Sequence, residues 1–178
     1  MHNETQGDNN AYTRLISLLE ARGVQYRLIE HPPEGRTDVV SPMRGNDLKD
    51  AAKCIVLIAK IGKRTTKYVL AVIPGDRRLD LSAVKRMFGA TYVAFASPDI
   101  AERLAGCVPG TILPFSFTTE LELIADPTLR SSEILYFNAA RLDRSIALKA
   151  ENYFAIAAPR IERIIEPPNR ETLIPPVS

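Results

Sequence analysis

The sequence has little of what several common protein classes need. Only two cysteines occur, Cys54 and Cys107, and neither belongs to a CxxC motif or a Cys/His cluster. This argues against a disulfide framework and a structural zinc site, and it fits a reducing, cytoplasmic compartment. No run of 18 apolar residues is present, so no membrane-spanning helix is expected. The polar first ten residues lack the apolar segment of a secretory signal.

The net charge is also small. The 178 residues carry 23 Lys and Arg against 21 Asp and Glu, a formal charge of +2. This balance argues against a broad nucleic-acid-binding face, so any RNA contact is expected to be local and modest. We expect neither DNA nor a membrane as a partner.

The length and the 46% hydrophobic content suit one domain with a full core. We predict a disordered leader over 1–10, a domain over 11–158, and a proline-rich tail over 159–178 that trails off or packs on a neighbour. Strands and helices intermingle without strict βαβ alternation. The sequence therefore predicts a mixed α/β domain around one sheet, a mostly antiparallel mixed sheet or partial barrel surrounded by helices.

Apolar periodicity and turn residues predict the individual elements. Two apolar runs, 54–60 and 68–74, flank a polar segment that contains Gly62, which is typical of a buried β-hairpin. Segment 34–52 is expected to be a loop with a short helix near 47–52. Helices are predicted over 11–22, 81–88, 98–105 and 150–157, and strands over 26–30, 92–96, 121–125, 134–137 and 145–148.

The stretch 106–115, GCVPGTILPF, is the most informative segment of the chain. It holds two glycines and two prolines directly after a predicted helix. Glycine permits unusual backbone angles and proline fixes its own, so the segment is expected to be a stiff loop with bare backbone N–H groups. Such groups can hold a carbonyl oxygen or a phosphate.

Several landmarks occur in a characteristic order. They are His31-Pro32, Ala52-Lys53, Val72-Ile73-Pro74-Gly75-Asp76, Gly106-x-x-Pro109-Gly110, Leu113-Pro114-Phe115, Leu123-Ile124-Ala125-Asp126-Pro127 and Asn138-Ala139-Ala140-Arg141. With these landmarks the chain resembles the YbaK-type, prolyl-tRNA-synthetase-associated editing domains, and the resemblance covers roughly residues 12–158. Departures from the family pattern occur at Cys54, Ser116 and Ala139-Ala140, near the expected pocket.

The resemblance implies an aminoacyl-tRNA deacylase that hydrolyses the ester of mischarged tRNA in trans. It implies the acceptor end of aminoacyl-tRNA as partner, a synthetase as a possible second partner, and no cofactor or metal. It also implies substrate assistance, in which the free hydroxyl of the terminal adenosine helps the attacking water. The rival hypothesis is a non-catalytic module that binds a nucleotide or a protein in the same cleft.

Each candidate residue has a functional and a structural interpretation. Lys53 is predicted to hold the ribose-phosphate or ester region, or else to be a solvated lysine. The backbone of Gly106 and Gly110 is predicted to bind the oxyanion, or else to form a rigid connector. Substrate-binding candidates with structural alternatives are His31, Cys107, Val108, Pro109, Asp126 and Asn138.

Three of these alternatives are specific. Asp126 either orients water or the substrate amine, or caps the amides of Thr128 and Leu129. His31 is a general-base candidate, but a structural hydrogen bond is favoured. Cys107 is expected to line the pocket as a small residue rather than act as a nucleophile.

Overall fold

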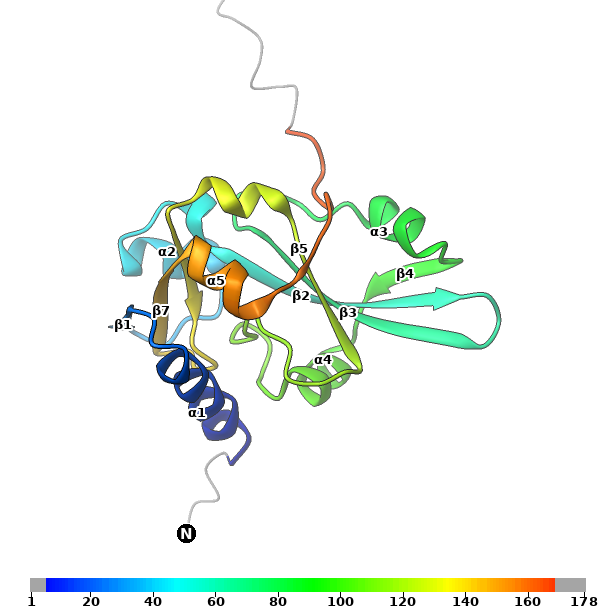
Figure 1. Cartoon of the computed structure of the whole chain (residues 1–178). Helices are drawn as coiled ribbons and strands as arrows, with labels where there is room; N and C mark the ends of the chain where they lie inside the picture. The colour runs from blue at the N-terminus through cyan, green and yellow to red at the C-terminus, as the bar shows by residue number, and fades with distance from the viewer. Residues whose placement is uncertain (1–5, 169–178) are drawn as a thin grey trace, which may run out of the picture.

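The computed structural model describes residues 6–168, and Figure 1 shows how the elements are arranged. The elements in chain order are α1 (Gln6–Ala21), β1 (Tyr26–Glu30), α2 (Thr37–Arg44), the 3-10 turn η1 (Leu48–Asp50), β2 (Ala52–Ile61), β3 (Thr65–Pro74), α3 (Leu81–Phe88), β4 (Tyr92–Phe95), α4 (Pro98–Ala105), β5 (Leu121–Ala125), the 3-10 turn η2 (Pro127–Ser131), β6 (Ile134–Asn138), β7 (Arg144–Lys149), α5 (Ala150–Ala157) and β8 (Arg160–Ile161). Within residues 6–168, no helix combines the length and hydropathy needed to cross a bilayer.

The strands form two sheets. The larger has the order β4-β2-β3-β5-β8, with antiparallel pairs around β2 and parallel pairs around β5. The smaller, β1-β7-β6, is antiparallel throughout, and an isolated bridge between Ala51 and Tyr136 links it to the start of β2. The predicted mixed α/β class is confirmed. The expectation of a single sheet is wrong, because β1 pairs with the distant β7 and not with β2.

The predicted β-hairpin is the longest feature of the larger sheet. Strands β2 and β3 pair over ten residues each, from Ala52 opposite Pro74 to Ile61 opposite Thr65. The part of β3 near the body is buried, whereas its first residues are exposed. The tip of the hairpin projects well beyond the rest of the domain (Figure 1).

Two apolar clusters, to which alternate residues of β2 and β3 contribute, form the core. One contains Leu15, Phe137 and Tyr153 and includes α1, α4 and α5, and the other contains Leu57 and Ile73 and includes α3. Packing against these clusters fixes the ends of the sheet, and with them the position of Lys53 at the start of β2.

The ends of the domain differ from the prediction. Helix α1 begins at Gln6, so residues 6–10 of the expected leader are helical, and residues 1–5 lie outside the described part. The start of the expected tail belongs to the fold, because β8 pairs with β5 and Ile164 and Ile165 are buried in the second cluster. The rest of the tail, residues 169–178, also lies outside the described part.

Helix α2 occupies a segment that was expected to be mostly loop. It holds Pro42 as its sixth residue, which is typical of a helix breaker because proline has no N–H to donate. In a helix of eight residues only one such bond is lost. The helix ends at Gly45, whose φ of 75° is the left-handed conformation that glycine adopts without a Cβ clash.

Candidate active site

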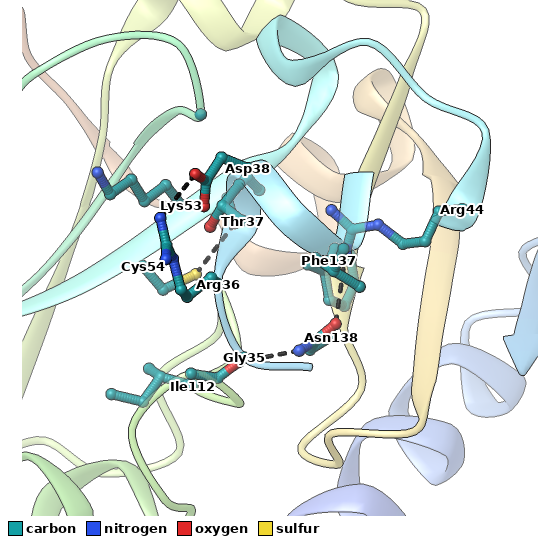
Figure 2. A pocket seen from close by; sticks show the side chains of 14 residues that line it. Gly35, Arg36, Thr37, Asp38, Arg44, Lys53, Cys54, Ile112, Phe137 and Asn138 are labelled. Atoms are coloured by element: carbon teal, nitrogen blue, oxygen red, sulfur yellow. Dashed lines mark hydrogen bonds and ion pairs between the residues drawn. The ribbon is translucent and has the colours of Figure 1, made fainter. Parts of the chain in front are cut away.

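A cavity of ≈ 380 Å³ lies where α2, the start of β2 and the end of β6 meet. Figure 2 shows Lys53 with Arg36 and Asp38 on one side of it, and Arg44 with Asn138 on the other. Polar and charged groups thus face each other across an open pocket. The lining residues are Gly35, Arg36, Thr37, Asp38, Val40, Arg44, Ala52, Lys53, Cys54, Gly75, Gly110, Ile112, Phe137 and Asn138.

Lys53 reaches this pocket from the second residue of β2, where it pairs with Ile73 of β3. Its backbone is therefore fixed by the core, while its side chain is only half-buried. Within residues 6–168 its ammonium group has no hydrogen bond or ion pair. The nearby Asp38 carboxylate is already paired with Arg36 at 2.9 Å. Lys53 is thus a positioned cation that is available to a ligand.

The backbone of the Gly/Pro loop reaches the same pocket at Gly110. Gly110 has a φ of 88°, and a Cβ added to it would lie 2.9 Å from Gly35 Cα. Two loops distant in sequence therefore touch main chain to main chain, which only glycine allows. This brings together two predicted site residues, Lys53 and Gly110.

Asn138 joins the two loops from the end of β6. Its side-chain Nδ2 donates hydrogen bonds of 2.9 Å to the carbonyl oxygens of both Glu34 and Gly110. Because the side chain is 7% exposed, these bonds are shielded from water. Asn138 therefore holds the pocket wall in shape, in addition to lining it.

A buried polar network supports Asn138 from behind. Its Oδ1 accepts a 2.9 Å hydrogen bond from Ser145 Oγ and a longer one from Arg44 Nη1. Arg44 also donates to Ser41, Asn46 and Ser145, and it has no carboxylate partner within residues 6–168. Burial of this guanidinium lowers its pKa to about 10.

We expect Asn138→Ala to weaken both the fold and the pocket. The substitution leaves the carbonyl oxygens of Glu34 and Gly110 without their donor, and each such loss costs roughly 1–3 kcal/mol. The free energy of unfolding should fall by about 2–6 kcal/mol, the sum of the two losses, measured by urea denaturation. Substrate turnover in the pocket should fall at least tenfold, measured without urea, where the variant is still folded.

Asn46→Ala is the matched control for this substitution. Asn46 also accepts a hydrogen bond from Arg44, at 3.1 Å, but it contacts neither loop through its side-chain amide. An equal loss of stability and turnover in both variants would show that the hydrogen bond to Arg44 is responsible. The bridge between the two loops would then have no role.

Other predicted site residues lie elsewhere. The Gly106 N–H donates to Glu102 O at 2.8 Å as the cap of α4, and Gly106 borders a separate hollow near α1. Cys107 is 1% exposed and packs in the core, so it does not line the pocket. Val108 and Pro109 also do not line the pocket. These four placements differ from the prediction because the loop turns toward the pocket only at Gly110.

Asp126 and His31 have structural contacts. Asp126 is fully buried and accepts hydrogen bonds from the N–H groups of Thr128 and Ile164, which supports the capping interpretation and excludes a place in the pocket. His31 Nε2 lies 2.7 Å from Ser145 Oγ, and its Nδ1 lies 2.9 Å from Pro32 O. His31 thus contacts the network behind Asn138 and not the cavity.

The sequence interpretation missed the residues that come from α2 and the loop before it. Gly35, Arg36, Thr37 and Asp38 line the pocket, and Arg44 closes its inner side. The first turn of α2 has no side-chain cap from Arg36. The N–H groups of Thr37 and Asp38 therefore have no acceptor within residues 6–168. Thr37 and Asp38 at the start and Gly45 at the end were the available signals for this helix.

The chemistry of the lining residues limits what the pocket can do. Burial raises the pKa of the Cys54 thiol well above its usual range, which favours the neutral thiol over the nucleophilic thiolate. Within residues 6–168, no group of three or more His, Cys, Asp or Glu side chains is arranged to hold a metal ion. What the pocket offers is one free ammonium group, a buried guanidinium and main-chain N–H groups.

A family model for the aminoacyl-tRNA editing domain matches residues 31–156, which include this whole pocket. The chain belongs to the aminoacyl-tRNA editing domain family. The resemblance inferred from the sequence is therefore confirmed. The match begins at His31 and so starts just before the loop that contributes Gly35 and Arg36.

Individual relatives agree with this membership. The multifunctional Ser/Thr-tRNA deacylase ProXp-y of Escherichia coli (strain K12) is 40% identical over 152 residues, which cover 84% of this chain and 90% of that protein. A proline–tRNA ligase of Bacillus cereus (strain AH187) is 32% identical over 82 residues, 46% of this chain and 14% of the ligase.

Solved structures show the same fold. A candidate trans-editing enzyme for prolyl-tRNA synthetase superposes with a TM-score of 0.73 at 20% identity, covering 88% of this chain and 98% of its own. A hypothetical protein superposes with a TM-score of 0.76 at 19% identity, covering 86% and 99%. The predicted fold class is confirmed by these neighbours.

Proposed function

We propose that this protein is a trans-editing aminoacyl-tRNA deacylase that acts on seryl- and threonyl-tRNA in the pocket containing Lys53. The activity class, hydrolysis of the ester of aminoacyl-tRNA, is supported by the family model and by the 40% identical deacylase. The choice of serine and threonine rests on the substrates in that relative's name. The observation that carries the assignment to this pocket is that Lys53 and the Gly110 main chain line one cavity.

The pocket suits an ester whose carbonyl oxygen gains negative charge during attack. The Lys53 ammonium would hold the ribose-phosphate or ester region of the terminal adenosine. The N–H groups of Gly110, Thr37 and Asp38 are donors for the oxyanion, and loss of one such donor costs roughly 2.7–4 kcal/mol of transition-state stabilisation in other enzymes. Of the two predicted oxyanion donors, Gly110 therefore remains in the proposal. The N–H groups in the first turn of α2 take the place of Gly106.

The attacking group is water in this proposal. Among the 14 residues that line the pocket there is no serine or histidine, and the one cysteine is held as a neutral thiol. Water adds to the carbonyl carbon, assisted by the free hydroxyl of the terminal ribose. The bond to the ribose oxygen then breaks, that oxygen takes up a proton, and amino acid and tRNA leave.

The cellular setting follows from the substrate. We place the protein in the cytoplasm, where aminoacyl-tRNA is made and used. Prolyl-tRNA synthetase is the proposed partner enzyme, because a segment of a proline–tRNA ligase matches this chain.

A panel of aminoacyl-tRNAs tests the proposal. We expect release of serine and threonine at least tenfold faster than release of phenylalanine, because a pocket discriminates by roughly 1–3 kcal/mol per methylene. The measurement is the loss of labelled amino acid from purified charged tRNA over the uncatalysed rate. No release from any member of the panel would favour a binding module instead.

A further inference from the structure

The basic residues of this chain are unevenly distributed. Segments 51–75 and 81–98 contain seven of the 23 basic residues and none of the 21 acidic ones. These segments form the β2–β3 hairpin, which runs from the middle of the molecule out to its tip, and α3 and β4, which lie beside the hairpin (Figure 1). The near-neutral net charge of the whole protein therefore conceals one basic end.

Four of these cations are concentrated at the tip of the β2–β3 hairpin. Lys60, Lys63, Arg64 and Lys67 are all exposed, and within residues 6–168 none of them forms an ion pair. The residues between them are Ile61, Gly62, Thr65 and Thr66. Unpaired cations on an exposed, acid-free ribbon favour a polyanionic partner.

An exposed aromatic side chain lies beside the cations. Tyr92 of β4 pairs with Lys60 and is 53% exposed, and the Lys60 ammonium lies 5.8 Å from the centre of its ring. Phe95, at the other end of β4, is 61% exposed. Aromatic rings next to lysines are typical of surfaces that contact nucleic-acid backbones and stack on bases or sugars.

The hairpin tip is far from the pocket, although Lys53 and the tip belong to the same β2–β3 hairpin. A strand advances about 3.3 Å per residue, so Lys63 lies roughly 30 Å along the chain direction from Lys53. A cation at the tip therefore cannot touch an ester bound beside Lys53. It can touch the body of a large molecule whose end is bound there.

We propose that the hairpin tip, defined as Lys60, Lys63, Arg64 and Lys67, is an arm that binds the phosphate backbone of the tRNA whose charged end occupies the pocket. This inference rests on the proposed function, since it assigns the body of the same substrate to a second surface. The arm supplies affinity that is independent of the amino acid. The pocket supplies the choice of amino acid.

The test compares two variants with the same loss of charge. The arm variant combines Lys63→Gln, Arg64→Gln and Lys67→Gln. The control combines Arg22→Gln, Arg27→Gln and Lys149→Gln. These residues are exposed; Arg22 directly follows α1, and Arg27 and Lys149 belong to the smaller sheet. Binding of uncharged tRNA is measured by fluorescence anisotropy at several salt concentrations, so that the result does not depend on catalysis.

We expect the arm variant to bind tRNA at least tenfold more weakly than wild type at low salt. Each lost phosphate contact removes roughly 0.7–0.9 from the slope of log affinity against log salt, so the slope should fall by about two to three. The control should stay within about twofold of wild type. Hydrolysis of 3′-O-seryl-adenosine, which has no tRNA body, should be the same for the arm variant and wild type.

Equal affinity and equal slope for wild type and arm variant would overturn the proposal, whether both bind tRNA or neither does. Unchanged tRNA binding together with lost capture of prolyl-tRNA synthetase would also overturn it, and would assign the arm to a protein partner. Failure of wild type to release any amino acid would refute the proposed function. The anisotropy comparison would still show whether the hairpin tip binds tRNA.

Discussion

Lys53→Ala is expected to lower the rate of aminoacyl-tRNA hydrolysis by at least 100-fold. Lys53 is the pocket residue whose charge is not already paired or committed to the fold, whereas Arg36 pairs with Asp38 and Arg44 bonds four side chains. Removal of a positioned group that stabilises developing charge costs roughly 10²–10³ in rate. The measurement is single-turnover hydrolysis of seryl-tRNA.

Stability should be almost unchanged by the same substitution. Lys53 is half-buried and has no hydrogen bond or ion pair within residues 6–168, so its removal leaves no buried group without a partner. The midpoint of thermal unfolding should therefore move by only a degree or two, roughly the effect of a few tenths of a kcal/mol. Lost activity together with unchanged stability would show that Lys53 acts in the reaction and not in the fold.

Two companion variants sharpen the result. Lys53→Arg keeps the charge but replaces a compact ammonium group with a planar guanidinium group. It should therefore retain only part of the wild-type activity. Lys149→Ala removes an exposed lysine at the end of β7, outside the pocket, and should retain wild-type activity. Full activity in Lys53→Ala would refute the assignment of the reaction to this pocket.

Local signals in the sequence were sufficient for most elements. Ser97 caps α4 through a hydrogen bond from the Ile100 N–H, Pro98 begins the helix, and Gly106 ends it in the left-handed conformation, all as the residue types indicate. The same reasoning located the hairpin and the late strands. Such signals depend on neighbours within about four residues, which the sequence displays directly.

The parts that were not predicted depend on distant contacts. Asp126 is satisfied by the N–H of Ile164, 38 residues later, so its burial could not be inferred from the turn alone. Gly35 lines the pocket because its backbone touches Gly110. Arg44 is buried by the end of β6 and by Ser145. In each case the decisive contact is with a residue that is distant in the sequence.

The two glycines of the Gly/Pro loop are expected to respond differently to alanine, with Gly110→Ala much the more damaging. Both have positive φ, 88° for Gly110 and 74° for Gly106, so alanine is strained at both positions. Only at Gly110 does the new Cβ meet backbone, 2.9 Å from Gly35 Cα and 3.2 Å from Gly35 O. At Gly106 nothing lies within 4 Å.

The backbone contact at Gly110 cannot be relieved by rotating a side chain, so one of the two loops must move. We expect Gly110→Ala to lower the free energy of unfolding by roughly 2–4 kcal/mol, as the sum of backbone strain and overpacking. The rate of hydrolysis should fall at least tenfold. Movement of the loop displaces the Gly110 N–H and disrupts the hydrogen bond from Asn138 to Gly110 O.

Gly106→Ala is the matched control, since it carries the φ penalty without the clash. It should cost only about 1–2 kcal/mol in stability and leave the rate within about twofold of wild type. Measuring urea unfolding and seryl-tRNA hydrolysis on both variants separates the two glycines. If Gly106→Ala slowed hydrolysis as much as Gly110→Ala, the oxyanion donors would lie earlier in the loop, at the N–H groups that follow α4, and the first turn of α2 would lose its proposed role.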